Sequence, residues 1–304
     1  MPRYGPLAAV VLAVVVAAAL AGGAPAGAQA PRDRFVFALA GGPDTLDPQA
    51  TAATLSFQVN KSLYDTLVEP DDEGKIVPAL AETWTVSPDG LVWTFRLRPG
   101  VKFHHGKTLD AGDVKATFER ILDPATRSPK RGDFGSIRTI EVVDPLTVRI
   151  TLAERFAPFL AALAHGWGAI LPSDLIARRH DFGTRPVGTG PFRYKEAVKG
   201  SHITVEANPD YYGGAPKLKS IVFKVIPDIN TVVAQLRTGE LDLAVVEAVH
   251  KAALERVLGT AEFRLFNEDD WKRFPQYLQG FVGPVGIEAA QVIADEALRG
   301  AGGR

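Results

Sequence analysis

Few side chains in this sequence are spaced for chemistry, and the adjacent histidines His104 and His105 are the first to consider. Neighbouring side chains on an extended chain point to opposite faces, so this pair makes a poor metal chelate. No H-E-x-x-H motif is present. The remaining histidines are scattered: His165, His180, His202 and His250. The sequence therefore predicts surface histidines and no metal site.

A second candidate is Gly106-Lys107-Thr108, which has the composition of the end of a phosphate-binding loop. That motif needs four residues between its first glycine and the Gly-Lys pair. Five residues follow Gly100 here. The next helix is predicted to begin at Asp110, too late for its N-terminus to lie on the phosphates. A nucleotide site is therefore not predicted.

Two further groups of residues have structural explanations as well as chemical ones. Gly188-Thr189-Gly190 could form an anion-binding nest, but a tight turn before Pro191 explains it equally well. A cluster of carboxylates is interpreted as a solvated loop: Glu69, Asp71, Asp72 and Glu73. No G-x-S-x-G motif and no cysteine is present, so no nucleophile and no catalytic residue is predicted.

Composition narrows the remaining classes of protein. The chain has 304 residues, which is enough for two core-bearing units, and its formal net charge is −1. Because no Lys/Arg run is present, the sequence predicts no nucleic-acid partner. Absence of cysteine excludes disulfides and thiolate metal sites.

The N-terminus has the pattern of a signal peptide. Arg3 precedes an apolar run from 7 to 21, which is too short for a comfortable membrane span. Cleavage after Ala28 is favoured, because cleavage after Ala30 would leave Pro31 at the new terminus. We therefore expect residues 1–28 to be removed and the protein to be exported; the alternative is an uncleaved anchor helix.

The elements around the histidine pair are the most regular in the chain. Ser87-Pro88-Asp89-Gly90 has turn chemistry and separates two alternating runs, which predicts a β-hairpin. Alternate residues of the second run share an apolar face: Leu91, Trp93, Phe95 and Leu97. Trp84 and Trp93 are expected in the core, with stacking on a ligand as the alternative. Asp110 is predicted to cap a helix that buries Val114, Phe118 and Ile121.

Residues 81–106 read A-E-x-W-x-V-S-x-D-G-L-x-W-x-F-x-L-R-x-G-V-K-F-H-x-G. This arrangement resembles the extracellular solute-binding proteins of family 5, the peptide-, oligopeptide- and nickel-binding subunits of ABC importers. One departure is His105, where the family usually has Asp. Further stretches match the family: T-L-D-P at 45–48, L-Y-D-T-L at 63–67, P-V-G-T-G-P-F at 186–192, N-P-D-Y-Y-G-G at 208–214 and G-E-L-D at 239–242.

The resemblance also implies a ligand-binding segment. In relatives, the residues around the start of T-L-D-P line the cleft and can pair with an extended peptide. Carried over by position, this implies five substrate-binding residues: Gly42, Pro43, Asp44, Thr45 and Leu46. Alternatively, these residues have only structural roles: Asp47-Pro48 ends a strand, and Asp44 lies in a solvated turn. Substitution of Asp44 by Ala is expected to alter ligand affinity with little effect on stability.

The implied fold is α/β and like a type II periplasmic binding protein, with a first lobe, an inserted subdomain and a second lobe that is largely missing. The implied boundaries are 1–28 for the signal peptide, 29–62 for the first part of lobe I, 63–185 for the inserted subdomain, 186–248 for the return of lobe I to the hinge, and 249–304 for a divergent tail. In that tail, residues 252–258 and 287–298 are predicted to be short helices, and 263–281 to be irregular. The resemblance is expected to end near Val249.

By resemblance, the protein is a periplasmic solute-binding component of an ABC importer and not an enzyme. It would capture a small solute, with a peptide favoured over a nickel chelate or a sugar, and deliver it to the membrane subunits of a permease. The resemblance implies a monomer without a cofactor. The alternative is a truncated product of the same family that binds no solute or only interacts with other proteins.

Overall fold

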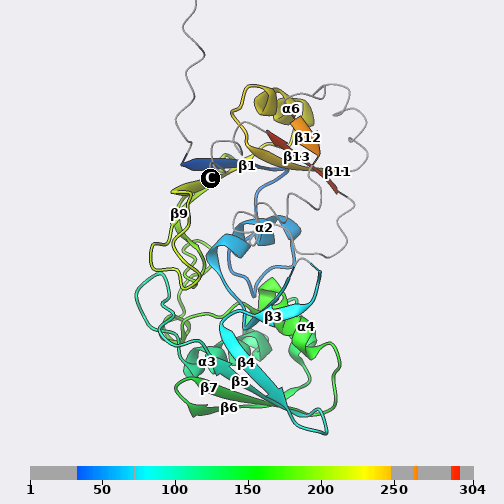
Figure 1. Ribbon diagram of the computed structural model, residues 1–304, viewed down its shortest axis with the longest axis vertical. Helices are drawn as coiled ribbons and strands as arrows, with labels where there is room; N and C mark the ends of the chain where they lie inside the picture. Colours follow the sequence, from blue (N-terminus) through cyan, green and yellow to red (C-terminus); the bar gives the residue numbers. More distant parts are fainter. Residues whose placement is uncertain (1–32, 72, 248–262, 266–288, 295–304) are drawn as a thin grey trace, which may run out of the picture.

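The computed structural model describes residues 33–71, 73–247, 263–265 and 289–294 (Figure 1). The predicted signal peptide at 1–28 and the predicted helix at 252–258 lie outside these residues. Among the described residues, no helix is long and apolar enough to cross a membrane. Two of the sheets lie at opposite ends of the long axis, with helix α2 (Thr54–Leu63) between them (Figure 1). A third sheet has two strands, β2 (Val68–Pro70) and β3 (Ile76–Pro78).

The larger sheet has seven strands within the described residues, in the order β12-β13-β11-β1-β10-β9-β8. Its centre is β1, which pairs in parallel with β10 on one side and with β11 on the other. Strand β1 is buried along residues 36–39, which fits its near-continuous apolar sequence, whereas β10 alternates buried and half-buried residues. The bounds are β1 Arg34–Leu39, β8 Phe192–Val198, β9 His202–Ala207, β10 Ser220–Val225, β11 Leu243–Glu247, β12 Phe263–Leu265 and β13 Ala289–Ala294.

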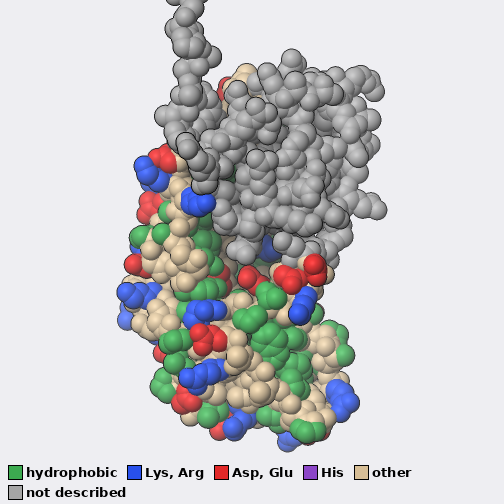
Figure 2. Space-filling model, in the orientation of Figure 1, with side chains coloured by type: hydrophobic (Ala, Val, Ile, Leu, Met, Phe, Trp, Pro, Cys, Tyr) green, Lys and Arg blue, Asp and Glu red, His purple; other side chains and the backbone are tan. Residues whose placement is uncertain are grey.

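The smaller sheet has the order β4-β5-β7-β6 and is antiparallel throughout. It contains two hairpins, β4 with β5, which the alternation predicts, and β6 with β7. Gly90 adopts a φ of 73° in the first turn, a conformation that glycine tolerates at no steric cost. The bounds are β4 Ala81–Val86, β5 Val92–Leu97, β6 Ile137–Asp144 and β7 Thr147–Leu152. Figure 2 shows charges of both signs interspersed over this end of the molecule.

Helix α3 (Ala111–Leu122) packs its apolar stripe against the smaller sheet, as predicted. Asp110 accepts hydrogen bonds from the N–H groups of Gly112 and Asp113, and the Asp113 carboxylate accepts from the Asp110 N–H. This reciprocal arrangement is a capping box. Lys107 Nζ donates to both carboxylates, at 3.1 Å to Asp110 and 2.5 Å to Asp113. The lysine of the Gly-Lys-Thr stretch therefore stabilises a helix start.

Helix α2 (Thr54–Leu63) is shorter than its apolar periodicity predicts, because the spacing of Leu55, Val59, Leu63 and Leu67 would carry a helix through L-Y-D-T-L. Continuation would require the Leu67 N–H to reach the Leu63 carbonyl. That carbonyl instead accepts from the Gly190 N–H at 3.0 Å. The remaining elements are β2 Val68–Pro70, β3 Ile76–Pro78, α4 Phe159–Ala164, α5 Ser173–Ala177, α6 Ile229–Arg237 and the 3₁₀ turns Pro124–Thr126, Arg131–Phe134 and Gly166–Gly168.

Two parts of the sequence prediction are wrong in secondary structure. Ala289–Ala294 was expected to lie in a helix at 287–298, but these residues form β13, which pairs antiparallel with β11. Pairing with a buried strand here overrides the helix propensity of an Ala-rich segment. Phe263–Leu265, expected to be irregular, forms β12. Strand β8 was not predicted, because its sequence alternates weakly and its outer half is exposed.

In the part of the chain that the structure describes, three clusters of buried side chains form the core. One fills the space between the smaller sheet, α3 and α4, and its members run from Leu67 to Ile170. A second joins α2 to the larger sheet, and a third packs α6 on the other face of that sheet. Val187 packs against both of the first two clusters, so it lies at the joint between them.

Trp93 is half-buried and packs against the core cluster of the smaller sheet. We predict that Trp93→Ala lowers the free energy of unfolding by about 3 kcal/mol, the lower end of the range for large aromatic truncations in a core. Trp93 lies 5.4 Å from Phe159 and 6.4 Å from Phe95 between ring centroids. Thr85→Ala is the control, because Thr85 lies exposed on the neighbouring strand and its loss should cost under about 0.5 kcal/mol. Equal denaturation midpoints for the two variants would contradict the core assignment.

Candidate functional site

The predicted binding segment follows the carboxyl end of β1. Because β10 and β11 run parallel to β1, their carboxyl ends lie at the same edge of the larger sheet. The Ile226 N–H donates to the Leu39 carbonyl at 2.8 Å, which extends the contact of β1 and β10 to that edge. In open α/β sheets this edge is where ligands bind.

The structure separates the five predicted site residues by environment. Gly42 is exposed, and a side chain added there would meet no atom within 4 Å. Pro43 and Thr45 are half-buried. Leu46 is buried in the core, and its N–H and carbonyl bond Gly183 and the Tyr64 hydroxyl respectively, each at 3.2 Å. Leu46 therefore anchors the segment, while Gly42 and Pro43 present its surface.

Asp44 uses its carboxylate within the protein. The Thr51 hydroxyl donates to it at 2.7 Å, the Thr45 N–H at 2.9 Å, and the Ser56 hydroxyl makes a third, short bond. Burial raises the pKa of Asp44, but these donors outweigh burial and hold the pKa below its usual value. The Asp44 carboxylate therefore holds together the loop that precedes α2. This structural role is larger than the alternative from the sequence, in which Asp44 only lies in a solvated turn.

Asp47 of T-L-D-P connects the predicted binding segment to helix α3, which packs against the smaller sheet. Its carboxylate pairs with the Arg120 guanidinium of α3, at 2.5 Å and 3.2 Å. Gln49 accepts from the same arginine at 2.7 Å and donates to the Thr117 carbonyl at 3.0 Å. Bidentate Arg–carboxylate pairs fix geometry as well as adding energy. Asp47 therefore holds the binding segment to α3 and does more than end a strand.

Gly188, Thr189 and Gly190 form what we call the return segment, which lies directly on the end of α2. A side chain on Gly188 would come within 2.1 Å of the Leu63 carbonyl oxygen, and one on Gly190 within 2.5 Å of the Leu63 carbonyl carbon. The N–H groups of both glycines donate within the protein, to His104 and to Leu63. The glycines thus permit close backbone approach, which favours the turn explanation over the anion nest.

His104 holds the return segment through hydrogen bonds to Gly188 and Gly190. Its backbone N–H donates to the Gly188 carbonyl at 2.8 Å. Its ring Nδ1 accepts from the Gly188 N–H at 3.3 Å, so the Nε2 that lies 3.0 Å from the Gly190 carbonyl carries the proton. Burial lowers the pKa of His104 to about 4. His104, predicted to be a surface histidine, is therefore half-buried and neutral, and its role is structural.

Asp65 holds the same segment through its side chain. The Thr189 hydroxyl donates to its carboxyl at 2.7 Å and the Tyr211 hydroxyl at 3.4 Å. The Asp65 carbonyl accepts from the Ile170 N–H at 3.0 Å. Burial raises the pKa of Asp65 to about 7. The sequence did not predict a role for Asp65. The available signal was an acidic residue between the apolar residues of L-Y-D-T-L, which indicates a carboxyl that accepts hydrogen bonds within the protein.

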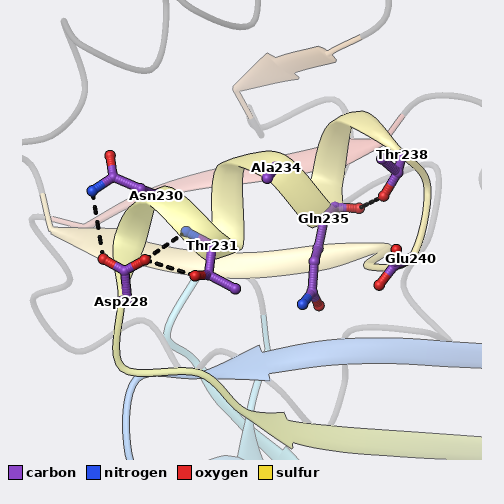
Figure 3. Close-up of a pocket in the computed structure, with 7 residues that line it drawn as sticks. All are labelled: Asp228, Asn230, Thr231, Ala234, Gln235, Thr238 and Glu240. Carbon is purple, nitrogen blue, oxygen red and sulfur yellow. Dashed lines mark hydrogen bonds between the residues drawn. The ribbon is translucent and has the colours of Figure 1, made fainter.

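A shallow groove on α6 is a separate feature. It is lined by Asp228, Asn230, Thr231, Ala234, Gln235, Thr238 and Glu240 (Figure 3). Asp228 caps α6 by accepting from the Thr231 N–H at 2.8 Å and from the Thr231 hydroxyl at 2.7 Å (Figure 3). These bonds give Asp228 a structural role at the start of α6.

Other chemistry considered from the sequence finds little geometric support. Within the described ranges, no group of three or more His, Cys, Asp or Glu side chains could hold a metal ion. Of the clustered carboxylates, Asp71 accepts from the N–H groups of Glu73 and Lys75 and so shapes an exposed turn. Glu69 is half-buried, and burial raises its pKa while the Lys61 ammonium lowers it.

The sheets and helices described above correspond to the first lobe of a type II periplasmic binding protein. Comparison with known proteins identifies the family. A family model described as "Bacterial extracellular solute-binding proteins, family 5 Middle" matches residues 75–277. The chain belongs to this family. Because the match continues to residue 277, the expectation that the resemblance ends near Val249 is wrong.

Among curated relatives, the glutathione-binding proteins GsiB of Salmonella paratyphi A and Escherichia coli O157:H7 are 40% and 39% identical over 212 residues. That alignment covers 69% of this chain but 41% of each relative. The chain therefore spans less than half the length of the curated relatives that it matches.

Solved structures show the same fold. AgaA of A. tumefaciens R10, in complex with agropinic acid, has a TM-score of 0.72 and 36% identity, covering 77% of this chain and 47% of AgaA. DppA of Helicobacter pylori, a periplasmic binding protein in complex with the peptide STSA, has a TM-score of 0.70 and 34% identity, covering 77% of this chain and 50% of DppA.

Asp44→Ala is predicted to lower the free energy of unfolding by about 1–3 kcal/mol, because two buried or half-buried hydroxyls and one N–H lose their acceptor. This differs from the sequence expectation of little effect on stability. Denaturant unfolding of Asp44→Ala, Ser56→Ala and the double variant measures the coupling. Strictly additive losses would show that Asp44 and Ser56 do not interact in solution.

Proposed function

We propose that this chain is the solute-binding component of an ABC importer and that it captures a short peptide of the size of glutathione. The observation that carries this proposal is the 40% identity to glutathione-binding proteins over 212 residues. Similarity to DppA in complex with the peptide STSA supports the same ligand class. Because relatives in the family are solute-binding proteins and not enzymes, no covalent chemistry is proposed.

We further propose that Gly42, Pro43, Asp44, Thr45 and Leu46 provide the ligand-facing segment of this lobe, each in a different way. Gly42 has open space around it, so a ligand backbone can approach closely. Extended peptides gain affinity from main-chain hydrogen bonds to such segments. Asp44 and Leu46 would act by fixing the segment, since their own polar groups are engaged within the protein.

The wider setting follows from the same proposal. Residues 1–28 would direct export to the periplasm, and the loaded protein would dock as a monomer on the membrane subunits of the permease. The boundaries at 63 and 185 remain part of the proposal, supported by the core cluster that runs from Leu67 to Ile170. Closure of two lobes around a ligand is the motion expected of such proteins.

Isothermal titration of the full chain with glutathione, dipeptides and tripeptides tests the proposal, and saturable heat with at least one of them is expected. Absence of heat with the whole panel would overturn it and favour the interaction-only alternative. Gly42→Val should weaken binding tenfold or more by filling the open space beside the segment. Gly132→Val is the matched control, because a side chain there also meets no atom within 4 Å and Gly132 lies in the inserted subdomain.

Equal affinity of Gly42→Val and the wild type would remove the segment from the binding site while leaving solute capture intact. The two parts of the proposal can therefore fail separately. Thermal unfolding of both glycine variants shows whether a change in affinity reflects binding or folding.

A further inference from the structure

Residues 181–185, which we call the 181–185 turn, lie directly against the candidate binding segment. The Leu46 N–H donates to the Gly183 carbonyl at 3.2 Å. A side chain added at Gly183 would come within 2.6 Å of the Thr45 hydroxyl oxygen, so the turn and the segment approach closely there. The exposed end of the turn, Arg185, is therefore held beside the segment.

The turn is closed by its own acidic residue. The Asp181 carboxylate accepts from the Gly183 N–H at 3.0 Å, and from the N–H and the hydroxyl of Thr184 at 3.3 Å and 2.6 Å. The Arg185 N–H donates to the Asp181 carbonyl at 3.1 Å. An aspartate that bonds the backbone ahead of it is a common device for shaping a turn. These bonds fix the backbone from which the Arg185 side chain begins.

Two aromatic side chains anchor the turn to the rest of the lobe. Phe182 is buried in the same core cluster as Leu46. His180 Nε2 lies 2.7 Å from the Arg185 carbonyl and donates to it, because a carbonyl oxygen only accepts. The position of Arg185 relative to the binding segment is therefore set by packing and by hydrogen bonds.

The charged end of Arg185 has no polar partner of its own. Within the ranges that the structure describes, its guanidinium makes no hydrogen bond and no ion pair, and the residue is exposed. The Thr184 hydroxyl lowers the pKa of Asp181 most, and the charge of Arg185 is the last of the causes that lower it. At most about 7 Å of chain separates Arg185 from Gly183. The long arginine side chain can cover that distance back to the segment.

The neighbouring charges favour an anion on this side of the segment. Arg178 and Arg179 directly follow α5 and are exposed, so they add two positive charges before the turn. The two nearby carboxylates are occupied: Asp44 accepts from three donors, and Asp181 closes the turn. A guanidinium presents a planar fork of donors that matches a carboxylate through two parallel hydrogen bonds.

We propose that Arg185 is a specificity-determining residue that binds a carboxylate of the captured peptide, so that the protein prefers peptides with a net negative charge. The assignment rests on the proposed function, because it names the ligand class of the same segment. A neutral peptide offers Arg185 only uncharged acceptors, which bind a guanidinium less strongly than a carboxylate does. A positively charged peptide is repelled by the same group.

Isothermal titration of the full chain with three tripeptides of similar size measures this preference: Ala-Glu-Ala, Ala-Gln-Ala and Ala-Lys-Ala. Affinity should fall in that order, by tenfold or more between the first and the last. In Arg185→Gln, the ratio of the first affinity to the last should shrink at least fivefold. The thermal unfolding of this variant should match that of the wild type, since the guanidinium bonds nothing within the described ranges.

Arg138→Gln is the matched control, because it removes the same charge from an exposed arginine of β6, at the other end of the long axis (Figure 1). It should keep the wild-type order and ratio of affinities. An unchanged ratio in Arg185→Gln would overturn the proposal, and so would an equally large loss in Arg138→Gln.

Two outcomes separate this preference from solute capture itself. Equal affinities for the three peptides in the wild type would overturn selection by charge and leave solute capture intact. Absence of heat with these peptides and with glutathione would overturn both.

A second measurement on the wild type covers the case in which Arg185→Gln does not fold. In ¹⁵N-labelled protein, the Nε–H resonance of Arg185 should shift on addition of Ala-Glu-Ala and much less on addition of Ala-Lys-Ala. A resonance that responds to neither peptide while both bind would overturn the proposal.

Discussion

The close approach of the return segment to the end of α2 is the contact on which the rest of the structure depends. Only glycine fits at positions 188 and 190, where the Leu63 carbonyl lies against the backbone. That carbonyl bonds Gly190, so α2 ends and the chain turns toward β2 and the smaller sheet. Hydrogen bonds from His104 and Asp65 hold the segment in place, and Val187 beside it packs against both neighbouring cores.

Placement of the candidate binding segment follows from this joint and from one ion pair. The joint fixes α2 against the larger sheet, and Asp44 fixes the loop before α2 through Ser56. The Asp47–Arg120 pair then ties the loop to α3. Removing one partner of such a half-buried pair leaves an uncompensated charge, so the pair constrains the loop strongly. A segment held at several points is suited to binding, because little ordering is left for the ligand to impose.

Local patterns in the sequence predicted the parts of the fold that depend on local physics. Alternation around Trp93 gave the hairpin, and Asp110 with Asp113 gave the start of α3. The parts that failed depend on distant partners. His104 meets Gly190 across 86 positions, and Asp65 meets Thr189 across 124, so no local pattern shows these contacts. Family resemblance placed the candidate binding segment directly after β1, at the carboxyl edge of the larger sheet, but could not show that Leu46 is core.

Native mass spectrometry of the full chain, purified from the culture and then incubated with glutathione and a mixture of short peptides, tests the central claim most directly. The account predicts a monomer beginning near Gln29 that carries one small solute or peptide. That species would show that this chain captures a ligand. A mass that stays at the unliganded value at millimolar peptide would contradict solute capture by this chain.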